Sequence, residues 1–165
     1  MDTTNYDTIT QEDKKFMQLA CDLAYENIDN GGGPFGAVIV RDGKVLSTGT
    51  NTVTIDNDPT AHAEVNAIRN ACRQTSNFKL EDCIVYTSCE PCPMCLSALY
   101  WAGVKKIYYG NTQLDAKKIN FDDNFIYQEI AKPQIARSIP CIHMADTDAI
   151  RAFEKWETKT DKTEY

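Results

Sequence analysis

The most informative stretch of this sequence is residues 87–95, Thr87-Ser88-Cys89-Glu90-Pro91-Cys92-Pro93-Met94-Cys95. The apolar run that leads into it, residues 83–87, predicts a buried strand. The two prolines favour the start of a helix, because the first amide donors of a helix are unpaired and a proline lacks one. In a helix over residues 93–101, Cys92 and Cys95 present their sulfurs on one side. The stretch therefore predicts a strand, a turn and a helix that begins with two thiols.

A second motif, His62-Ala63-Glu64, lies upstream at the start of another predicted helix. A catalytic zinc ion takes three protein ligands and keeps a fourth position for water. His62, Cys92 and Cys95 form such a set, in which two thiolates neutralise the charge of the ion. Glu64 is then placed to move protons between that water and a substrate. A His-x-Glu triplet followed by Pro-Cys-x-x-Cys is typical of zinc-dependent nucleobase deaminases.

Two other interpretations of these cysteines stay open. Cys89, Cys92 and Cys95 are evenly spaced and, with His62, would close a tetrahedral structural zinc site, but this leaves Glu64 without a role. The Cys-x-x-Cys run after a strand also fits a redox dithiol, which leaves both His62 and Glu64 unexplained.

The other thiols and the second histidine are expected to be structural. Four cysteines fall on apolar faces and are predicted to be in the core: Cys21, Cys72, Cys83 and Cys141. His143 lies inside a predicted strand, where a structural role is favoured over metal binding.

Length, charge and cysteine usage restrict the class of protein. A chain of 165 residues fits one domain with its own core. The net charge of −7 counts against a broad nucleic-acid-binding surface, because affinity for phosphates rests largely on Lys and Arg. Seven cysteines would leave one unpaired in a disulfide framework, so a cytoplasmic location is expected. The sequence has no secretory signal pattern and no run of about 20 apolar residues, so no membrane segment is expected.

Apolar periodicity and turn residues predict an α/β fold, with one mixed sheet and helices on both faces. Thr10 and Asp13 resemble a capping box at the first helix. Asp42-Gly43 predicts a hairpin turn, and Thr147 or Asp148 is expected to cap the last helix. The expected helices cover residues 10–28, 61–73, 93–101 and 125–130 and a final segment with Ile150, Phe153 and Trp156 on one face. The expected strands cover residues 37–40, 45–49, 83–87, 107–109 and 138–144.

Residues 32–40, 57–64 and 87–95 together resemble bacterial guanine deaminases of the cytidine deaminase-like superfamily, and the likeness extends to residues 121–127 and 164–165. The resemblance implies one three-layer α/β/α domain over residues 1–165, with a five-stranded mixed sheet and one zinc ion per subunit. It also implies a homodimer in which the C-terminal helix and tail, residues 146–165, are swapped between subunits.

The same resemblance implies a small purine substrate, while the acidic charge and the lack of a long apolar run predict no nucleic-acid or membrane partner. Hydroxide activated by zinc would attack the ring carbon that bears the amino group, with Glu64 as proton shuttle, so that guanine gives xanthine and ammonia. Asn51 and Asp123 would hydrogen-bond the purine, and Phe35 and Trp101 would flank its ring. Tyr165 would close the pocket of the partner subunit. The full set of implied substrate-binding residues is Phe35, Asn51, Ala63, Trp101, Asp123 and Tyr165.

Plainer interpretations of these residues, and other functions, remain. From the residues alone, Asn51 ends a strand, Asp123 caps a helix and Trp101 belongs to the core. Other substrates for the same chemistry are a guanosine-type nucleoside, an aminotriazine and tRNA adenosine, the last opposed by the acidic charge. A zinc-stabilised module without turnover is the alternative from a different class.

Overall fold

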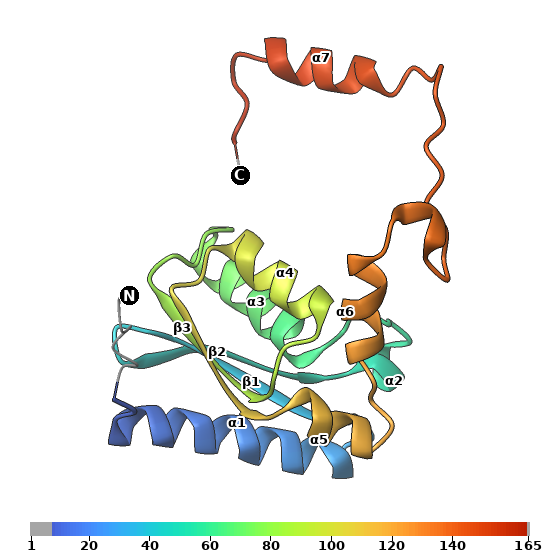
Figure 1. Cartoon of the computed structure of the whole chain (residues 1–165). Helices are drawn as coiled ribbons and strands as arrows, with labels where there is room; N and C mark the ends of the chain where they lie inside the picture. The colour runs from blue at the N-terminus through green and yellow to red at the C-terminus, as the bar shows by residue number, and fades with distance from the viewer. Residues whose placement is uncertain (1–7, 165) are drawn as a thin grey trace, which may run out of the picture. The chain divides into compact units, whose positions relative to one another are not determined.

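The computed structural model describes residues 8–164 and divides the chain into two compact units, Met1–Asn124 and Phe125–Tyr165 (Figure 1). All the predicted zinc ligands and the predicted proton shuttle belong to the first unit. Each unit is described separately below.

A single helix covers one face of the sheet in the first unit. This helix, α1, runs over Gln11–Asp29 and begins at the capping box predicted from Thr10 and Asp13: the Thr10 hydroxyl accepts from the Asp13 amide at 3.0 Å, and the Asp13 carboxylate accepts from the Thr10 amide at 2.7 Å. Three of its residues are buried against the sheet: Ala20, Ala24 and Asn27. Ile28, which periodicity placed on the buried stripe, is instead 52% exposed.

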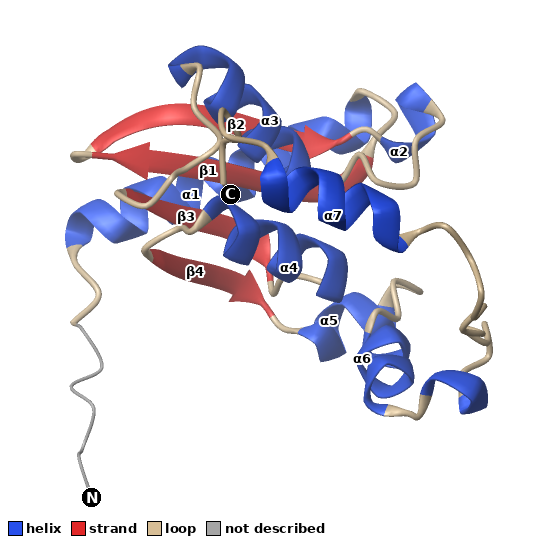
Figure 2. Cartoon of the chain, turned by 90° about the horizontal axis from the view of Figure 1, so that it is seen from above, coloured by secondary structure: helices blue, strands red, loops and turns tan. Residues whose placement is uncertain are grey.

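Four strands form the sheet, in the order β2-β1-β3-β4 (Figure 2). They are β1 (Gly33–Arg41), β2 (Lys44–Asn51), β3 (Cys83–Cys89) and β4 (Lys106–Asn111). β1 pairs antiparallel with β2 and β3, whereas β3 and β4 are parallel, so the sheet is mixed as predicted. The β1–β2 hairpin turns at Asp42-Gly43, where both residues have positive φ (51° and 69°), as a tight hairpin turn requires.

The helices that carry the zinc-ligand motifs cover the opposite face of the sheet (Figure 1). They are α3 (Ala63–Thr75) and α4 (Pro93–Ala102), while α2 (Val53–Asp56) and α5 (Gln113–Lys118) are short connecting helices. Gly49 lets α3 lie very close to β2, since a Cβ at this position would lie 2.2 Å from the Ala63 carbonyl oxygen and 2.4 Å from the Ala67 amide. The three layers match the α/β/α architecture expected from the sequence.

The second unit has helices α6 (Asn124–Ala131, whose first residue closes the first unit) and α7 (Ile150–Thr158) and a 3₁₀ turn over Gln134–Ala136. Its most buried side chain is a carboxylate: Glu129 accepts from the amide and hydroxyl of Ser138 at 2.6 and 2.7 Å and pairs with Lys132. No hydrophobic residue is buried in its described part, 125–164.

Several predictions for the second unit were wrong. Residues 138–144 form no strand, so the sheet of the described chain has four strands rather than five. Cys141 is exposed rather than in the core. His143 is exposed too, and its assignment as a structural residue rather than a ligand stays a prediction. Neither Thr147 nor Asp148 caps α7, whose N-cap is Ala149 and makes no side-chain cap bond.

Of the other three cysteines predicted to lie in the core, one is buried and two are only partly buried. Cys83 is buried in the core, whereas Cys21 and Cys72 are only half-buried. Among the described residues, the structure contains no helix with the length and apolar character needed to cross a membrane.

Candidate active site

Two helix N-termini bring the predicted zinc ligands together. His62 is the N-cap residue of α3 and Cys92 is the N-cap residue of α4, with Pro93 at the first helical position as the sequence predicted. The Cys95 amide in the first turn of α4 donates to the Cys92 sulfur at 3.5 Å. The local sequence therefore places both thiols and the imidazole at the positive ends of two helices, where thiolates are favoured.

The spacing of the three ligand atoms fits a zinc ion. His62 Nδ1 lies 3.6 Å from the Cys92 sulfur and 3.5 Å from the Cys95 sulfur, and the three ligand atoms all lie within 4.8 Å of one another. A tetrahedral zinc ion with bonds of about 2.3 Å to sulfur and about 2.0 Å to nitrogen holds such atoms about 3.5 Å apart. A donor set of two sulfurs and one imidazole nitrogen also favours zinc over harder metal ions such as magnesium.

The protonation of the two thiols is coupled. The pKa of Cys92 is lowered, first by a hydrogen bond from the Cys95 thiol and also by His62. The pKa of Cys95 is raised by that same hydrogen bond to Cys92 and by burial. The pKa of His62 is raised, mainly by its hydrogen bond with the Cys92 sulfur. These directions favour the thiolate form at Cys92, and a bound metal ion would favour it at Cys95 as well.

Glu64 lies buried in the first turn of α3, next to the ligand cluster. The hydroxyl of Thr87 on β3 donates to its Oε1 at 3.0 Å, and Glu64 is 6% exposed. Burial is the main cause that raises the pKa of Glu64. A carboxyl group whose pKa is raised by burial is suited to hold and release a proton, as a general acid–base must.

Cys89 lies outside the ligand cluster. Among the described residues, only His62, Cys92 and Cys95 form a cluster with metal-binding spacing, while the Cys89 thiol donates to the Thr112 carbonyl at 3.8 Å. Burial raises the pKa of Cys89 to about 11, which opposes a thiolate there. This geometry disfavours the closed four-ligand site and favours three ligands with a fourth position for water. The redox-dithiol interpretation also loses support, because the imidazole contacts both sulfurs.

Asp123 lies close to the cluster. Its Oδ1 is shielded from solvent and has no hydrogen-bond partner among residues 8–164. The pKa of Asp123 is raised, mainly by burial and next by the negative charge of Cys92. Buried polar atoms are nearly always hydrogen-bonded. The unpaired Oδ1 of Asp123 is therefore available to accept a hydrogen bond from a bound ligand.

The other predicted substrate residues have different surroundings. Asn51 is buried at the end of β2, and its Oδ1 accepts from the Val53 amide at 3.3 Å. Phe35 is half-buried and packs edge-on against Phe121, with ring centroids 5.0 Å apart. Trp101 on α4 is 67% exposed, so the interpretation as a core residue is wrong.

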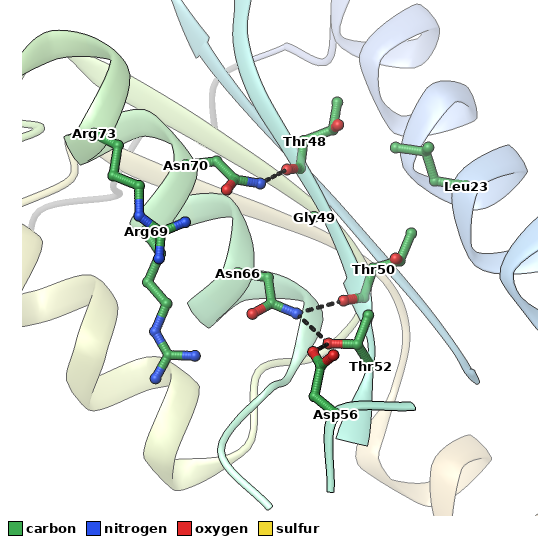
Figure 3. Close-up of a pocket in the computed structure, with 10 residues that line it drawn as sticks. All are labelled: Leu23, Thr48, Gly49, Thr50, Thr52, Asp56, Asn66, Arg69, Asn70 and Arg73. Atoms are coloured by element: carbon green, nitrogen blue, oxygen red, sulfur yellow. Dashed lines mark hydrogen bonds between the residues drawn. The ribbon is translucent and has the colours of Figure 1, made fainter. Parts of the chain in front are cut away.

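The structure says little about the last two predicted substrate-binding residues, Ala63 and Tyr165. Ala63 is fully buried between the two motif residues His62 and Glu64. Tyr165 lies outside the described residues. A hollow of about 550 Å³ along β2 contains none of the predicted site residues, although Thr50 and Thr52 on either side of Asn51 line it (Figure 3).

A family model described as the cytidine and deoxycytidylate deaminase zinc-binding region matches residues 10–111. The chain belongs to this family. The matched range contains the three zinc-ligand candidates and Glu64, so the zinc-binding group and the fold agree with the expectation from the sequence.

Within this family, the chain is similar to several known proteins. The chain is 51% identical over 151 residues to guanine deaminase from Bacillus subtilis, across 91% of this chain and 97% of that protein. The X-ray structure of that guanine deaminase matches with a TM-score of 0.90 over 92% of this chain and 98% of the other. A tRNA-specific adenosine deaminase from Buchnera aphidicola is 37% identical over 68% of this chain and 74% of its own length.

Sequence reasoning missed two residues that hydrogen-bond to predicted site residues: Thr87 to Glu64, and Asn27 to the carbonyl of Asn51. Thr87 was assigned only to a strand, yet its hydroxyl binds Glu64. Asn27 was overlooked because helical periodicity was followed to Ile28, whereas the buried stripe of α1 runs through Ala20, Ala24 and Asn27. A polar residue at the last position of such an apolar stripe was the available signal.

Proposed function

We propose that this protein deaminates guanine to xanthine and ammonia. The observation that carries the proposal is the geometry of His62, Cys92 and Cys95 at tetrahedral zinc spacing beside the buried carboxyl group of Glu64. The 51% identity with a guanine deaminase over nearly its whole length supports guanine as the substrate.

The reaction replaces the amino group of the purine ring by an oxygen from water. A zinc ion held by His62, Cys92 and Cys95 supplies Lewis-acid activation of that water. Glu64 takes a proton from the water and passes it to the adjacent ring nitrogen as the new carbon–oxygen bond forms. Glu64 then takes the proton of the added hydroxyl group and delivers it to the amino group, so that the carbon–nitrogen bond breaks, ammonia leaves and the ring carbonyl forms. Thr87 holds the Glu64 carboxyl group in place by donating to Oε1.

Four side chains are suited to bind the purine. The buried Oδ1 of Asp123 can accept from N–H groups on the guanine edge. The Oδ1 of Asn51 is occupied by the Val53 amide, which leaves its Nδ2 as the donor for a purine acceptor. The paired rings of Phe35 and Phe121 offer an aromatic wall. Ala63 contributes backbone next to the zinc ligand His62.

We further propose a homodimer with swapped C-terminal segments. Apolar side chains of the second unit stay exposed, and a second copy of this chain is the partner that could cover them: Ile135, Ile139, Ile142, Met144, Ile150, Phe153 and Trp156. Tyr100 and Trp101 on α4 are also exposed and offer an apolar surface. In this arrangement Tyr165 and Trp101 would complete the substrate pocket across the interface. A monomer in analytical ultracentrifugation at micromolar concentration would overturn the dimer.

The likeness to a tRNA-specific adenosine deaminase supports a second candidate function. The net charge of −7 opposes it, because binding of a tRNA phosphate backbone requires basic surface. A small purine is therefore the favoured substrate, and a cytoplasmic location stays a prediction.

Ammonia release from a panel of substrates tests this function. We expect release from guanine that a zinc chelator abolishes, and little release from guanosine, ammeline, cytosine, or a tRNA anticodon stem-loop. Release mainly from guanosine would keep the zinc chemistry and overturn the base-sized pocket. No release from any substrate by zinc-loaded protein would favour a structural zinc module.

A further inference from the structure

One buried amide lies where the two strands that carry predicted purine contacts meet. Asn27, near the end of α1, is 4% exposed. Its Nδ2 donates to the carbonyl oxygens of Gly33 and Asn51, each at 2.8 Å. One side-chain nitrogen thus ties the beginning of β1 to the end of β2.

The strand pairing is irregular at this point. Gly33 faces Asn51, but the next pair is Gly36 with Thr50, so Pro34 and Phe35 are extra residues on β1. Such a bulge re-aims side chains and interrupts the ladder of hydrogen bonds. The two hydrogens of the Asn27 amide satisfy the carbonyls that the interrupted ladder leaves at its end.

The backbone around Asn27 leaves no room for adjustment. A Cβ at position 32 would lie 2.3 Å from both Asn27 Nδ2 and the Asn51 carbonyl oxygen. A Cβ at position 33 would lie 3.0 Å from the side-chain amide of Asn51. Gly32 and Gly33 therefore allow Asn27 and Asn51 to come together, which explains two of the three successive glycines at the start of β1.

We infer that Asn27 is a positioning residue that sets substrate binding by fixing Asn51 and the Phe35 bulge relative to each other. The inference rests on the proposed roles of Asn51 and Phe35 in purine binding. The zinc ligands and Glu64 lie on α3 and α4, so a change at Asn27 on α1 disturbs the contacts to the purine more than the reacting groups.

The chemistry of the site requires an amide. Two carbonyl oxygens face the same atom, so that atom must be a donor with two hydrogens. Asn27→Asp keeps the shape of the side chain but places an acceptor opposite two acceptors. Asn27→Ser keeps one hydroxyl donor and is the milder replacement.

Steady-state kinetics of guanine deamination by the zinc-loaded, full-length protein test the inference. For Asn27→Asp we expect KM to rise about tenfold or more while kcat changes less than about threefold, because uniform binding is lost rather than transition-state contacts. Zinc content should stay that of the wild type. The KM of Asn27→Ser should lie between those of the wild type and Asn27→Asp. This variant serves as the test if Asn27→Asp does not fold.

Asn70→Asp is the matched control. Asn70 Nδ2 donates to the Thr48 carbonyl of the same strand at 2.9 Å, but at an exposed position away from the bulge (Figure 3). Its KM should stay within about twofold of wild type.

The outcomes separate this inference from the proposed function. A wild-type protein that is inactive on guanine would overturn the function itself. If the wild type is active and folded Asn27 variants keep its KM, or lose kcat and zinc instead, the positioning role of Asn27 is wrong.

Discussion

The two units of this chain differ in what holds them together. Residues 8–124 bury apolar side chains on both faces of a sheet, including Val38, Ile39, Val85 and Leu99, all with no exposed surface. Residues 125–164 bury no apolar side chain, and their most buried group is the Glu129 carboxylate. Hydrogen bonds from Ser138 and the Lys132 ion pair lower the pKa of Glu129 to about 2, with Lys132 as the largest cause.

This difference suggests that the two units have different roles in the protein. The first unit has the core that a stable domain needs and contains the zinc-ligand cluster. The second unit has about 40 residues and exposes ten large apolar side chains, which is consistent with the proposed swapped dimer. We therefore expect damage to the first unit to affect chemistry or folding, and damage to the second to affect substrate closure and assembly.

The largest expected effect is on turnover from within the first unit. Glu64→Ala, with Glu64→Gln as its volume-matched counterpart, should lower kcat by about 10²–10⁴-fold, because the proton shuttle is lost. Metal analysis and circular dichroism should show zinc and fold as in wild type. Glu26→Ala, at an exposed position of α1, is the control. Near-full activity in either Glu64 variant would contradict the mechanism.

An intermediate effect is expected from the second unit. Deletion of residues 162–165 should lower kcat/KM for guanine about tenfold or more while the melting temperature changes little, since a chain end adds few packed contacts. Steady-state kinetics and thermal melts of the same preparations compare the two effects. Unchanged kinetics would remove Tyr165 from the site, and a large loss of stability would show that the two units fold as one.

The smallest effect is a loss of stability without a loss of chemistry. Thr10→Ala removes the capping box of α1 and should lower the free energy of unfolding by about 1 kcal/mol. Urea denaturation at fixed protein and zinc concentrations measures this change, with Thr8→Ala as control. Because the cap lies at the opposite end of α1 from Asn27, KM should not change; a changed KM would mean that the start of α1 also influences the substrate site.

Local chemistry explains why much of the first unit could be predicted. The capping box at Thr10, the turn at Asp42-Gly43 and the prolines before α4 each satisfy a backbone requirement within a few residues. The candidate zinc ligands could be identified for the same reason, because two short motifs supply all three. The short helix α5 was missed although Thr112 and Asp115 form the same type of capping box as Thr10 and Asp13.

Predictions failed where long-range contacts decide the structure. The apolar residues at 138–144 suggested a strand, but a strand needs a neighbour, and none of the described strands pairs with this segment. The role of Asn27 depends on two carbonyls brought together from β1 and β2, which spacing along the sequence does not reveal.

Gly49 also affects the geometry of the candidate metal site, because the lack of a side chain lets α3 approach β2 closely. The backbone of α3 rests directly on this residue, and α3 begins one residue after His62. Cys92 and Cys95 lie at the start of α4, whereas the three atoms nearest to a Cβ at position 49 all belong to α3. We therefore expect a methyl group at position 49 to displace α3, and with it the imidazole of His62, so that Gly49→Ala would weaken zinc binding although position 49 carries no ligand atom.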